Sequence, residues 1–249
     1  MADHRPTAAD HAPARIRARL AAQRNHDYLS DAILGGIDGC VTTFAVVAGA
    51  TGGSLSALVV VVLGFANLIA DGFSMAVGNY HATRSQRELV EQTRRSEERH
   101  IDRVPEGERE EIRQIFAQKG FEGDTLEQVV DTITANRQLW VDTMITEEHG
   151  LQLEGPDPVR AGAVTFVAFF LVGLVPLLPY IVPGVPADTS FASSAVLTAA
   201  AFFAIGWAKG GRLEQPRLRA AWETLWTGGA AALLAYGAGW LLRTLFGAG

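Results

Sequence analysis

The chain has 249 residues, a net charge of −6, an apolar fraction of 48% and a mean hydropathy of +0.14. Residues 83–160 hold 18 of the 27 acidic and 11 of the 21 basic residues, whereas residues 161–208 hold one acid and no Lys or Arg. This division indicates membrane segments interrupted by an acidic insertion, not one soluble globule. The acidity argues against nucleic acid as a partner and favours cations. The single cysteine excludes an internal disulfide and a Cys-based zinc site.

Residues 1–30 are polar and Arg-rich and lack the apolar core of a cleavable signal peptide. We expect this segment to be a disordered cytoplasmic tail. It contains His4, His11 and His26, so the alternative interpretation is a tail that collects metal ions.

The first predicted span covers about residues 32–50, and Gly52 and Gly53 form the turn after it, with Ser54 as the expected helix cap. The second span begins near residue 55 and stays apolar to about residue 77. Because no Pro or Gly follows Tyr80 for more than 20 residues, we expect this helix to continue into the insertion, to about residue 102.

The insertion is predicted to be helical throughout. A second helix should begin at Pro105, cover residues 106–119 and stop at Gly120. A third helical stretch is expected over residues 126–148, with a break near Asn136 as the alternative.

Three more spans are predicted, at about residues 161–182, 191–208 and 224–242, and Pro176 and Pro179 should kink or end the first of them. Apart from Arg243, which lies on the far side, Lys and Arg fall in the tail, the insertion and the loop 209–219, which five spans place on one side, the cytoplasm. The predicted fold is therefore an all-α membrane protein with five transmembrane helices and a cytoplasmic three-helix metal-binding domain between the second and third. The expected domain boundaries are 1–30 for the tail, 31–82 for the first two spans, 83–160 for the metal-binding domain and 161–249 for the last three spans.

Polar side chains interrupt the first two apolar spans. Asp38 lies in the first, and Asn67, Asp71, Met75 and Asn79 recur on one face of the second. A charged carboxylate at the centre of a bilayer costs roughly 2.5–3.5 kcal/mol, so such groups usually face a bundle interior or a water-filled path. Carboxylate and thioether together favour a path for a transition-metal ion. The alternative is a carboxylate that reaches the lipid headgroups.

Acidic residues at helical spacing suggest metal ligands in the insertion, because residues three or four apart project together from a helix. The candidate ligands are Glu97, His100, Glu108, Glu111, Met144 and Glu148, with Glu147 and His149 beside the last of them. Glu-x-x-His pairs on bundled helices are typical of di-iron carboxylate sites, and these ligand types suit Fe(II), Mn(II) and similar ions. The alternative is an ordinary solvated surface, where Glu residues and Glu–Arg pairs are common.

Three segments carry a resemblance to a known family. They are DGCVTTFAVVAGATGG, which starts at Asp38, NLIADGFSMAVGNYHATRSQRE, which starts at Asn67, and LWVDTMITEEHGL, which starts at Leu139. Over about residues 27–249 the chain resembles the vacuolar iron transporter family, and the form of the chain resembles its bacterial members.

The resemblance implies a homodimer with five transmembrane helices per subunit and a transport path between the subunits. It implies export of Fe(II), Mn(II) and related ions from the cytosol in exchange for protons, and no prosthetic group. The family's path residues correspond to Asp38 and Met75, and its soluble ligands to the six candidates named above. The chain departs from the family's plant pattern at His100, where Glu is common, at Ile145, where Met is common, and at Asn67, where a path Glu is common.

The residues and the resemblance together predict a transporter, not an enzyme, in a bacterial plasma membrane, with its N-terminus and metal-binding domain cytoplasmic. Its partners should be divalent metal ions, protons, lipid and a second copy of the chain, with no nucleic acid. Two alternatives stay open, a membrane-tethered di-iron oxidase and a metal sensor that transports nothing.

Overall fold

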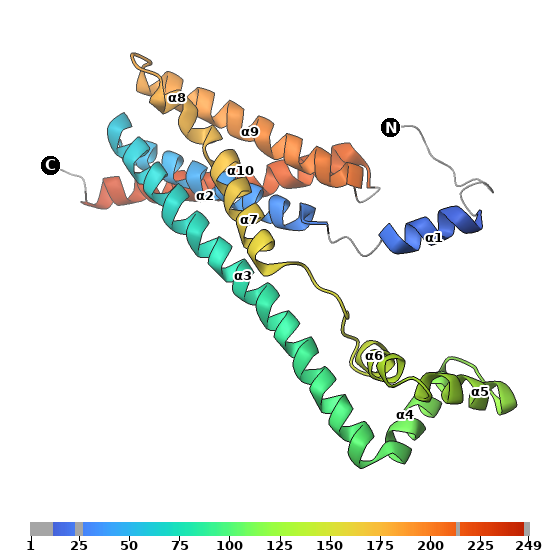
Figure 1. Cartoon of the computed structure of the whole chain (residues 1–249). Coiled ribbons are helices and arrows are strands. Elements are labelled where there is room, and N and C mark those ends of the chain that lie inside the picture. Colours follow the sequence, from blue (N-terminus) through green and yellow to red (C-terminus); the bar gives the residue numbers. More distant parts are fainter. Residues whose placement is uncertain (1–11, 23–26, 213–214, 247–249) are drawn as a thin grey trace. The chain divides into compact units, whose positions relative to one another are not determined.

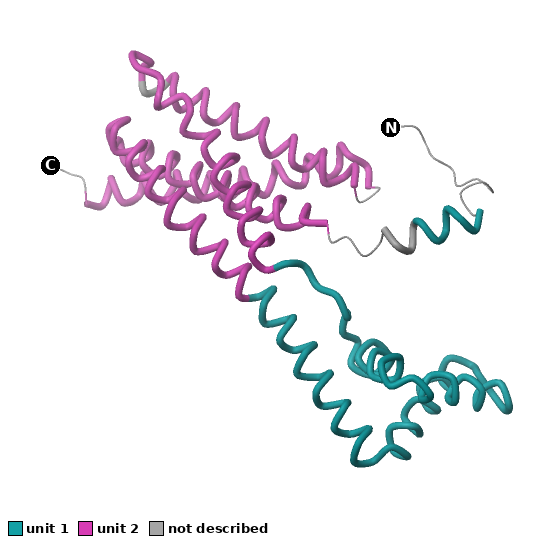
Figure 2. The backbone as a smooth tube through the Cα atoms, viewed as in Figure 1, with its two compact units in different colours: residues 1–26, 82–157 teal, residues 27–81, 158–249 magenta. Residues whose placement is uncertain are grey.

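The structure is a computed structural model that describes residues 12–22, 27–212 and 215–246, and within these ranges every regular element is a helix (Figure 1). The chain divides into two compact units (Figure 2). Unit 1 comprises residues 1–26 and 82–157, and unit 2 comprises residues 27–81 and 158–249.

Five helical segments in the described residues are long and apolar enough to span a membrane, as predicted. They are Leu29–Gly52 (α2), Ala57–Arg103 (α3), Pro158–Ile181, Thr189–Arg212 and Arg217–Phe246 (α10). The third segment consists of α7 (Pro158–Gly173), the short 3-10 helix η2 (Val175–Leu177) and α8 (Leu178–Ile181), and the fourth lies in α9 (Ala187–Arg212). The number of spans and the all-helical class are therefore confirmed.

Helix α2 is the centre of unit 2, where it packs against α7, α9 and α10. Gly35 and Gly39 lie one turn apart on α2 and face the backbone of α7. A Cβ atom at Gly35 would lie 2.2 Å from the carbonyl oxygen of Thr165, and one at Gly39 would lie 2.3 Å from that of Phe169. The two backbones approach this closely only because both positions lack a side chain, which is the usual way that helices pack tightly in lipid.

The predicted break in the third span occurs at its prolines. Helix α7 ends at Gly173, and Pro176 and Pro179 lie in the first turns of η2 and α8. The hydroxyl of Ser194 donates to the carbonyl oxygen of Pro176 at 2.6 Å, and that of Ser190 donates to the carbonyl oxygen of Pro179 at 3.3 Å. These hydroxyls satisfy carbonyl groups at the helix break, as a membrane interior requires.

Helix α3 is continuous from Ala57 to Arg103, which confirms the predicted extension of the second span. The predicted cap at Ser54 was wrong. Ser54 has a φ of +57°, outside the helix, and the backbone N–H of Val59 donates to the hydroxyl of Ser56. Ser56 is therefore the residue that caps the start of the helix.

Residues 82–157 of unit 1 contain the end of α3 followed by α4 (Pro105–Gln118), α5 (Gly123–Thr134) and α6 (Arg137–Glu147). Pro105 starts α4 as predicted. The third predicted stretch is two helices, because the side chain of Asn136 accepts a hydrogen bond from the N–H of Leu139 and starts a new helix there. An apolar core joins the four helices. Its buried members are Ile101, Ile112, Val130, Ile133, Trp140, Val141, Met144 and Ile145.

The tail was expected to be disordered, but its described part forms helix α1 (Pro13–Ala22). The expectation of disorder is therefore wrong for these residues. His4, His11 and His26 lie outside the described residues.

The close approach of α2 and α7 predicts a large effect of one methyl group. Gly39→Ala should destabilise the protein by about 1–3 kcal/mol, because the new Cβ would overlap backbone that cannot move aside as a side chain can. Gly78→Ala is the control, since nothing lies within 4 Å of a Cβ at that position. Thermal unfolding of both variants in detergent measures the difference, and an equally stable Gly39→Ala variant would contradict the packing described.

Candidate metal centres

Several candidate ligands of the insertion come together in unit 1. Glu97 and His100 lie one turn apart near the end of α3, and Glu108 lies in the first turn of α4. Glu148 and His149 directly follow the end of α6. The short connection at Val104 turns the chain from α3 into α4, so that Glu108 faces the last turns of α3.

The ligand atoms form two groups that share Glu97, and the atoms of each group lie within 4.8 Å of one another. In the first group, Nδ1 of His100 lies 3.4 Å from Oε1 of Glu108 and 4.0 Å from Oε1 of Glu97. In the second, Nε2 of His149 lies 3.0 Å from Oε1 of Glu97 and 3.6 Å from Oε2 of Glu148. We call these five residues and Glu111 the carboxylate cluster.

Two carboxylates of the cluster are deeply buried and incompletely satisfied. Glu97 is 3% exposed and Glu108 is 6% exposed. The Oε2 atom of each has no hydrogen-bond partner. A buried charged oxygen without a partner costs several kcal/mol unless a cation or proton compensates it. His100, Glu148 and His149 are more exposed, so the cluster opens to solvent on one side.

The electrostatics of the cluster favour a bound proton or cation. Burial, as the largest cause, and the negative charges of Glu111, Glu97 and Glu148 together raise the pKa of Glu108 to about 7. Burial is also the main cause that raises the pKa of Glu148, with Glu111 and Glu97 acting in the same sense. A divalent cation would reverse both shifts, because it favours the charged form of a carboxylate.

Two predicted ligands lie at the edge of this arrangement. Glu111 is exposed on α4, and its charge acts on both Glu108 and Glu148. Met144 lies one turn before Glu148 on α6 and is fully buried in the apolar core of unit 1. The roles of both as metal ligands remain predictions.

The backbone after α6 holds His149 in place. Gly150 has a φ of +65°, a conformation that suits glycine, and the N–H of Leu151 donates to the carbonyl oxygen of Ile145 at 3.0 Å. Leu151 packs on the apolar core.

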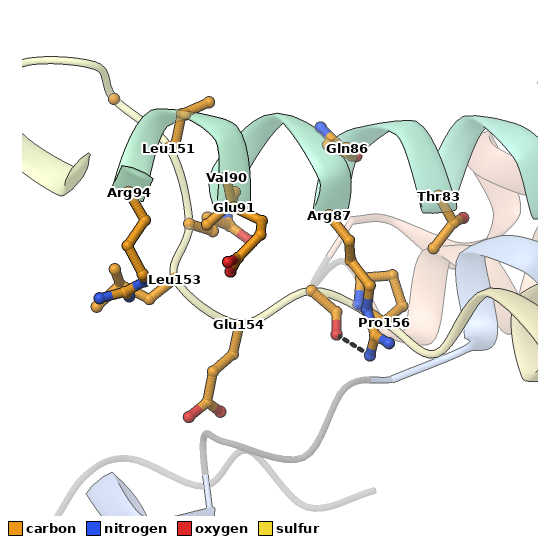
Figure 3. Close-up of a pocket in the computed structure, with 13 residues that line it drawn as sticks. Thr83, Gln86, Arg87, Val90, Glu91, Arg94, Leu151, Leu153, Glu154 and Pro156 are labelled. Atoms are coloured by element: carbon orange, nitrogen blue, oxygen red, sulfur yellow. Dashed lines mark hydrogen bonds between the residues drawn. The ribbon is translucent and has the colours of Figure 1, made fainter. Parts of the chain in front are cut away.

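The segment that follows lines a cavity of about 650 Å3 against α3 (Figure 3). There Nη2 of Arg87 donates to the carbonyl oxygen of Gly155 at 3.1 Å, and Arg94 forms an ion pair with Asp142 at 2.7 Å. The contact of Arg87 therefore fastens the segment after His149 to α3, and the ion pair of Arg94 joins α3 to α6.

In unit 2, polar residues of α2 and α3 face one another at successive levels. The Nδ2 of Asn67 donates to the hydroxyl of Thr42 at 3.1 Å. Asp38 and Asp71 lie close enough for their charges to interact, and Nδ2 of Asn79 donates to Oδ1 of Asp31 at 2.8 Å. We call these residues, with Met75, the membrane polar stripe. They are Asp31, Asp38, Thr42, Asn67, Asp71, Met75 and Asn79.

Asp38 and Met75 line one cavity of about 780 Å3 within unit 2. Lys209, Arg212 and Asp27 also line it, and Arg212 forms an ion pair with Asp27. Both Asp38 and Asp71 are half-buried.

Sequence reasoning missed Asp31, whose Oδ2 is buried and has no hydrogen-bond partner. Asn79 joins it to α7, because Nδ2 of Asn79 also donates to the hydroxyl of Thr165 at 2.7 Å. Asp31 lies seven residues before Asp38, two helical turns away on the same face, and that spacing was the available signal. His149 was noted only as a neighbour of the ligands, whereas its Nε2 atom lies within 4 Å of carboxylate oxygens of both Glu97 and Glu148.

These features define an integral membrane protein with a polar stripe in its membrane-spanning unit and a carboxylate–imidazole cluster in the other. The model of the VIT family matches residues 29–240, and the chain belongs to this family. A protein of Toxoplasma gondii named vacuolar iron transporter is 35% identical over 89% of this chain and 76% of its own length. Vacuolar iron transporter 1 of Arabidopsis thaliana is 36% identical over 84% of both chains. A protein of Plasmodium berghei named vacuolar iron transporter is 28% identical over 88% of this chain and 83% of its own length.

The raised pKa of Glu108 predicts how the stability of metal-free unit 1 depends on pH. Between pH 4.5 and about 7 the folded protein keeps a proton that the unfolded chain releases, so stability should fall as the pH rises through this range. Glu108→Gln should flatten the dependence.

Urea unfolding of the full chain tests this prediction. Its signal is the fluorescence of Trp140, which is buried in the core of unit 1, after the other tryptophans are replaced by Phe. Glu106→Gln, an exposed residue of α4, is the control. Equal pH dependence in wild type and Glu108→Gln would show that Glu108 does not carry the effect.

Proposed function

We propose that this protein is a membrane transporter that exports Fe(II), Mn(II) and related divalent ions from the cytosol by exchange for protons. The observation that carries the proposal is the membrane polar stripe, in which Asp38 and Asp71 interact and Asp38 and Met75 line one cavity. Membership of the VIT family supports it, and the curated relatives are named vacuolar iron transporters.

The carboxylate cluster collects the ion on the cytosolic side. Its buried oxygens lack partners, and carboxylate with imidazole suits Fe(II) and similar ions. The ion then crosses the membrane past Asp38, Asp71 and Met75, between two copies of the chain in a bacterial plasma membrane. The oxygens and the sulfur of these side chains replace the water that the ion leaves behind.

Proton exchange follows from the chemistry of a carboxylate in a site of low polarity. Burial disfavours the charged form, so the empty carboxylate binds a proton, and a divalent ion displaces that proton when it binds. One carboxylate therefore holds either a proton or a metal ion. Return of the proton from the far side resets the carboxylate and drives the exchange.

Replacement of the path carboxylates tests the membrane route. Asp38→Asn and Asp71→Asn should each reduce uptake of Fe(II) and Mn(II) into proteoliposomes to the level of empty vesicles under an imposed pH gradient, because an amide neither releases a proton nor balances the charge of the ion. Asp124→Asn, an exposed residue of α5, is the matched control and should transport normally. Full transport by both path variants would remove these residues from the route.

The same measurement separates the two alternative functions. Consumption of oxygen with Fe(II), without metal in the vesicles, would indicate a membrane-tethered oxidase. Equal metal content in vesicles with and without the protein would indicate a sensor that transports nothing. Either result would overturn the proposal.

The cluster should contribute to delivery but not form the path. Glu108→Ala combined with Glu111→Ala should weaken metal binding by the full chain roughly tenfold or more and slow transport at low metal concentration. Transport at saturating metal should continue, because the path residues are intact. The matched control is Glu106→Ala with Glu122→Ala, two exposed residues of the same unit. Unchanged binding in the first variant would contradict a role of the cluster.

A further inference from the structure

Helix α10 carries an apolar groove that the proposed transport path does not use. The groove has a volume of about 630 Å3 and is lined by residues of α2, α9 and α10, all within unit 2. Its lining residues on α10 include Trp222, Trp226, Gly229, Leu233 and Tyr236, which recur every three or four residues and therefore share one face of the helix. Trp226 is 78% and Leu233 is 75% exposed, so the described part of the chain leaves this face uncovered.

The groove is long enough to hold an acyl chain of one membrane leaflet. From Trp222 to Tyr236 it follows about 21 Å of helix at 1.5 Å per residue, whereas the hydrocarbon of one leaflet is roughly 15 Å deep. At the Tyr236 end, the ring centroid of Phe191 lies 5.9 Å from that of Tyr236 and 6.2 Å from that of Phe44. These three rings give the deep end of the groove an apolar lining, and its volume is typical of a site for a small molecule.

A polar hollow lies at the other end of the same face of α10. It has a volume of about 300 Å3 and is lined by Gln215, Pro216, Arg219, Ala220 and Glu223. Arg219 precedes Trp222 by three residues, so it continues the face that lines the groove. Arg219 and Glu223 form an ion pair at 2.9 Å, and both side chains are mostly exposed. An exposed pair within one helix contributes little to stability, so other charged groups can replace it at little cost.

We propose that the groove and the hollow together bind one phospholipid whose headgroup carries a phosphate and a primary ammonium, which is the chemistry of phosphatidylethanolamine. An acyl chain occupies the groove, the phosphate pairs with Arg219 and the ammonium pairs with Glu223. The bound lipid thus exchanges one ion pair of the protein for two.

The charges of the hollow select this headgroup. The guanidinium of Arg219 suits a phosphate, to which it can donate two parallel hydrogen bonds. The carboxylate of Glu223 accepts from an ammonium and repels a headgroup whose only charge is negative, as in phosphatidylglycerol. The quaternary ammonium of phosphatidylcholine has no N–H to donate and is bound best by aromatic rings, whereas the residues that line the hollow are not aromatic.

The depth of the two features favours a phospholipid over a second copy of the chain. Arg219 is the third residue of the span Arg217–Phe246, so it lies at the level of the headgroups. Trp222, one turn further, is of the residue type that favours this level. The charged hollow and the apolar groove therefore follow one another in the order in which a phospholipid presents its headgroup and its chain.

Filling the groove tests the position of the acyl chain. Gly229→Leu should lower the affinity of the full chain in detergent for dioleoyl phosphatidylethanolamine roughly tenfold, because the new side chain occupies the groove. The fold should be unchanged, since nothing lies within 4 Å of a Cβ at Gly229. Gly237→Leu is the matched control on the same helix. Its Cβ would also be free, but Gly237 does not line the groove, so its affinity should equal that of wild type. Native mass spectrometry at a series of lipid concentrations measures the affinities.

The same measurement with three headgroups on identical dioleoyl chains tests the hollow. Wild type should bind phosphatidylethanolamine roughly fivefold more tightly than phosphatidylcholine or phosphatidylglycerol. Glu223→Gln should remove this preference, whereas Arg219→Gln should weaken binding of all three lipids, because each carries a phosphate. Arg243→Gln, an exposed arginine near the other end of α10, is the control and should change none of these affinities.

Three results would overturn the proposal. In the first, Gly229→Leu and Gly237→Leu bind phosphatidylethanolamine equally well. In the second, wild type binds the three headgroups with equal affinity. In the third, Gly229→Leu forms fewer dimers than Gly237→Leu at unchanged lipid affinity, which would assign the groove to a second copy of the chain. None of these readouts depends on metal transport.

Discussion

Two carboxylates buried side by side impose the strongest constraint on unit 1. Glu97 and Glu108 are almost fully enclosed, and each retains an oxygen without a partner. A protein that needed only stability would place apolar side chains at these positions, since buried charge without full compensation is unfavourable. The helices around them are nevertheless well packed on an apolar core. The core thus supports an arrangement that is incomplete until a cation or a proton joins it.

The same principle recurs in unit 2 with a different solution. There Asp31 accepts a hydrogen bond from Asn79, and Asn67 donates one to Thr42. Asp38 and Asp71 instead lie close enough for their charges to interact. Amides and hydroxyls satisfy part of the membrane polar stripe and fix its position. In the middle of the stripe, the carboxylate of Asp38 and the thioether of Met75 line a cavity, where polar groups within a membrane are usually placed.

The fold was largely predictable from the sequence because the governing signals are local. Runs of apolar residues set the five spans, Pro105 and Gly120 bounded α4, and Pro176 and Pro179 broke the third span. The helix cap was predicted at Ser54 and lies at Ser56, because similar polar residues near a helix start compete for this position. The division of the third stretch at Asn136 was left open, and helix α1 was not predicted.

The candidate site was predictable only in part. Helical spacing picked out Glu97, His100 and Glu108, since these residues lie close in the chain. His149 and Asp31 are identified by their hydrogen bonds with Glu97 and Asn79, which lie 52 and 48 residues away in the chain. No local pattern reports such pairings, which depend on how α3 meets the end of α6 and the start of α2.

The exposure of the carboxylate cluster is graded, with Glu97 and Glu108 at the bottom and His100, Glu148 and His149 at the open side. An ion would enter and leave such an open cluster faster than it would a fully enclosed site. Water reaches the outer side chains and could replace them one at a time, so an ion bound there would have a short residence time. Storage requires slow release, whereas handing an ion onward requires quick release, and the open side of the cluster would suit the second task.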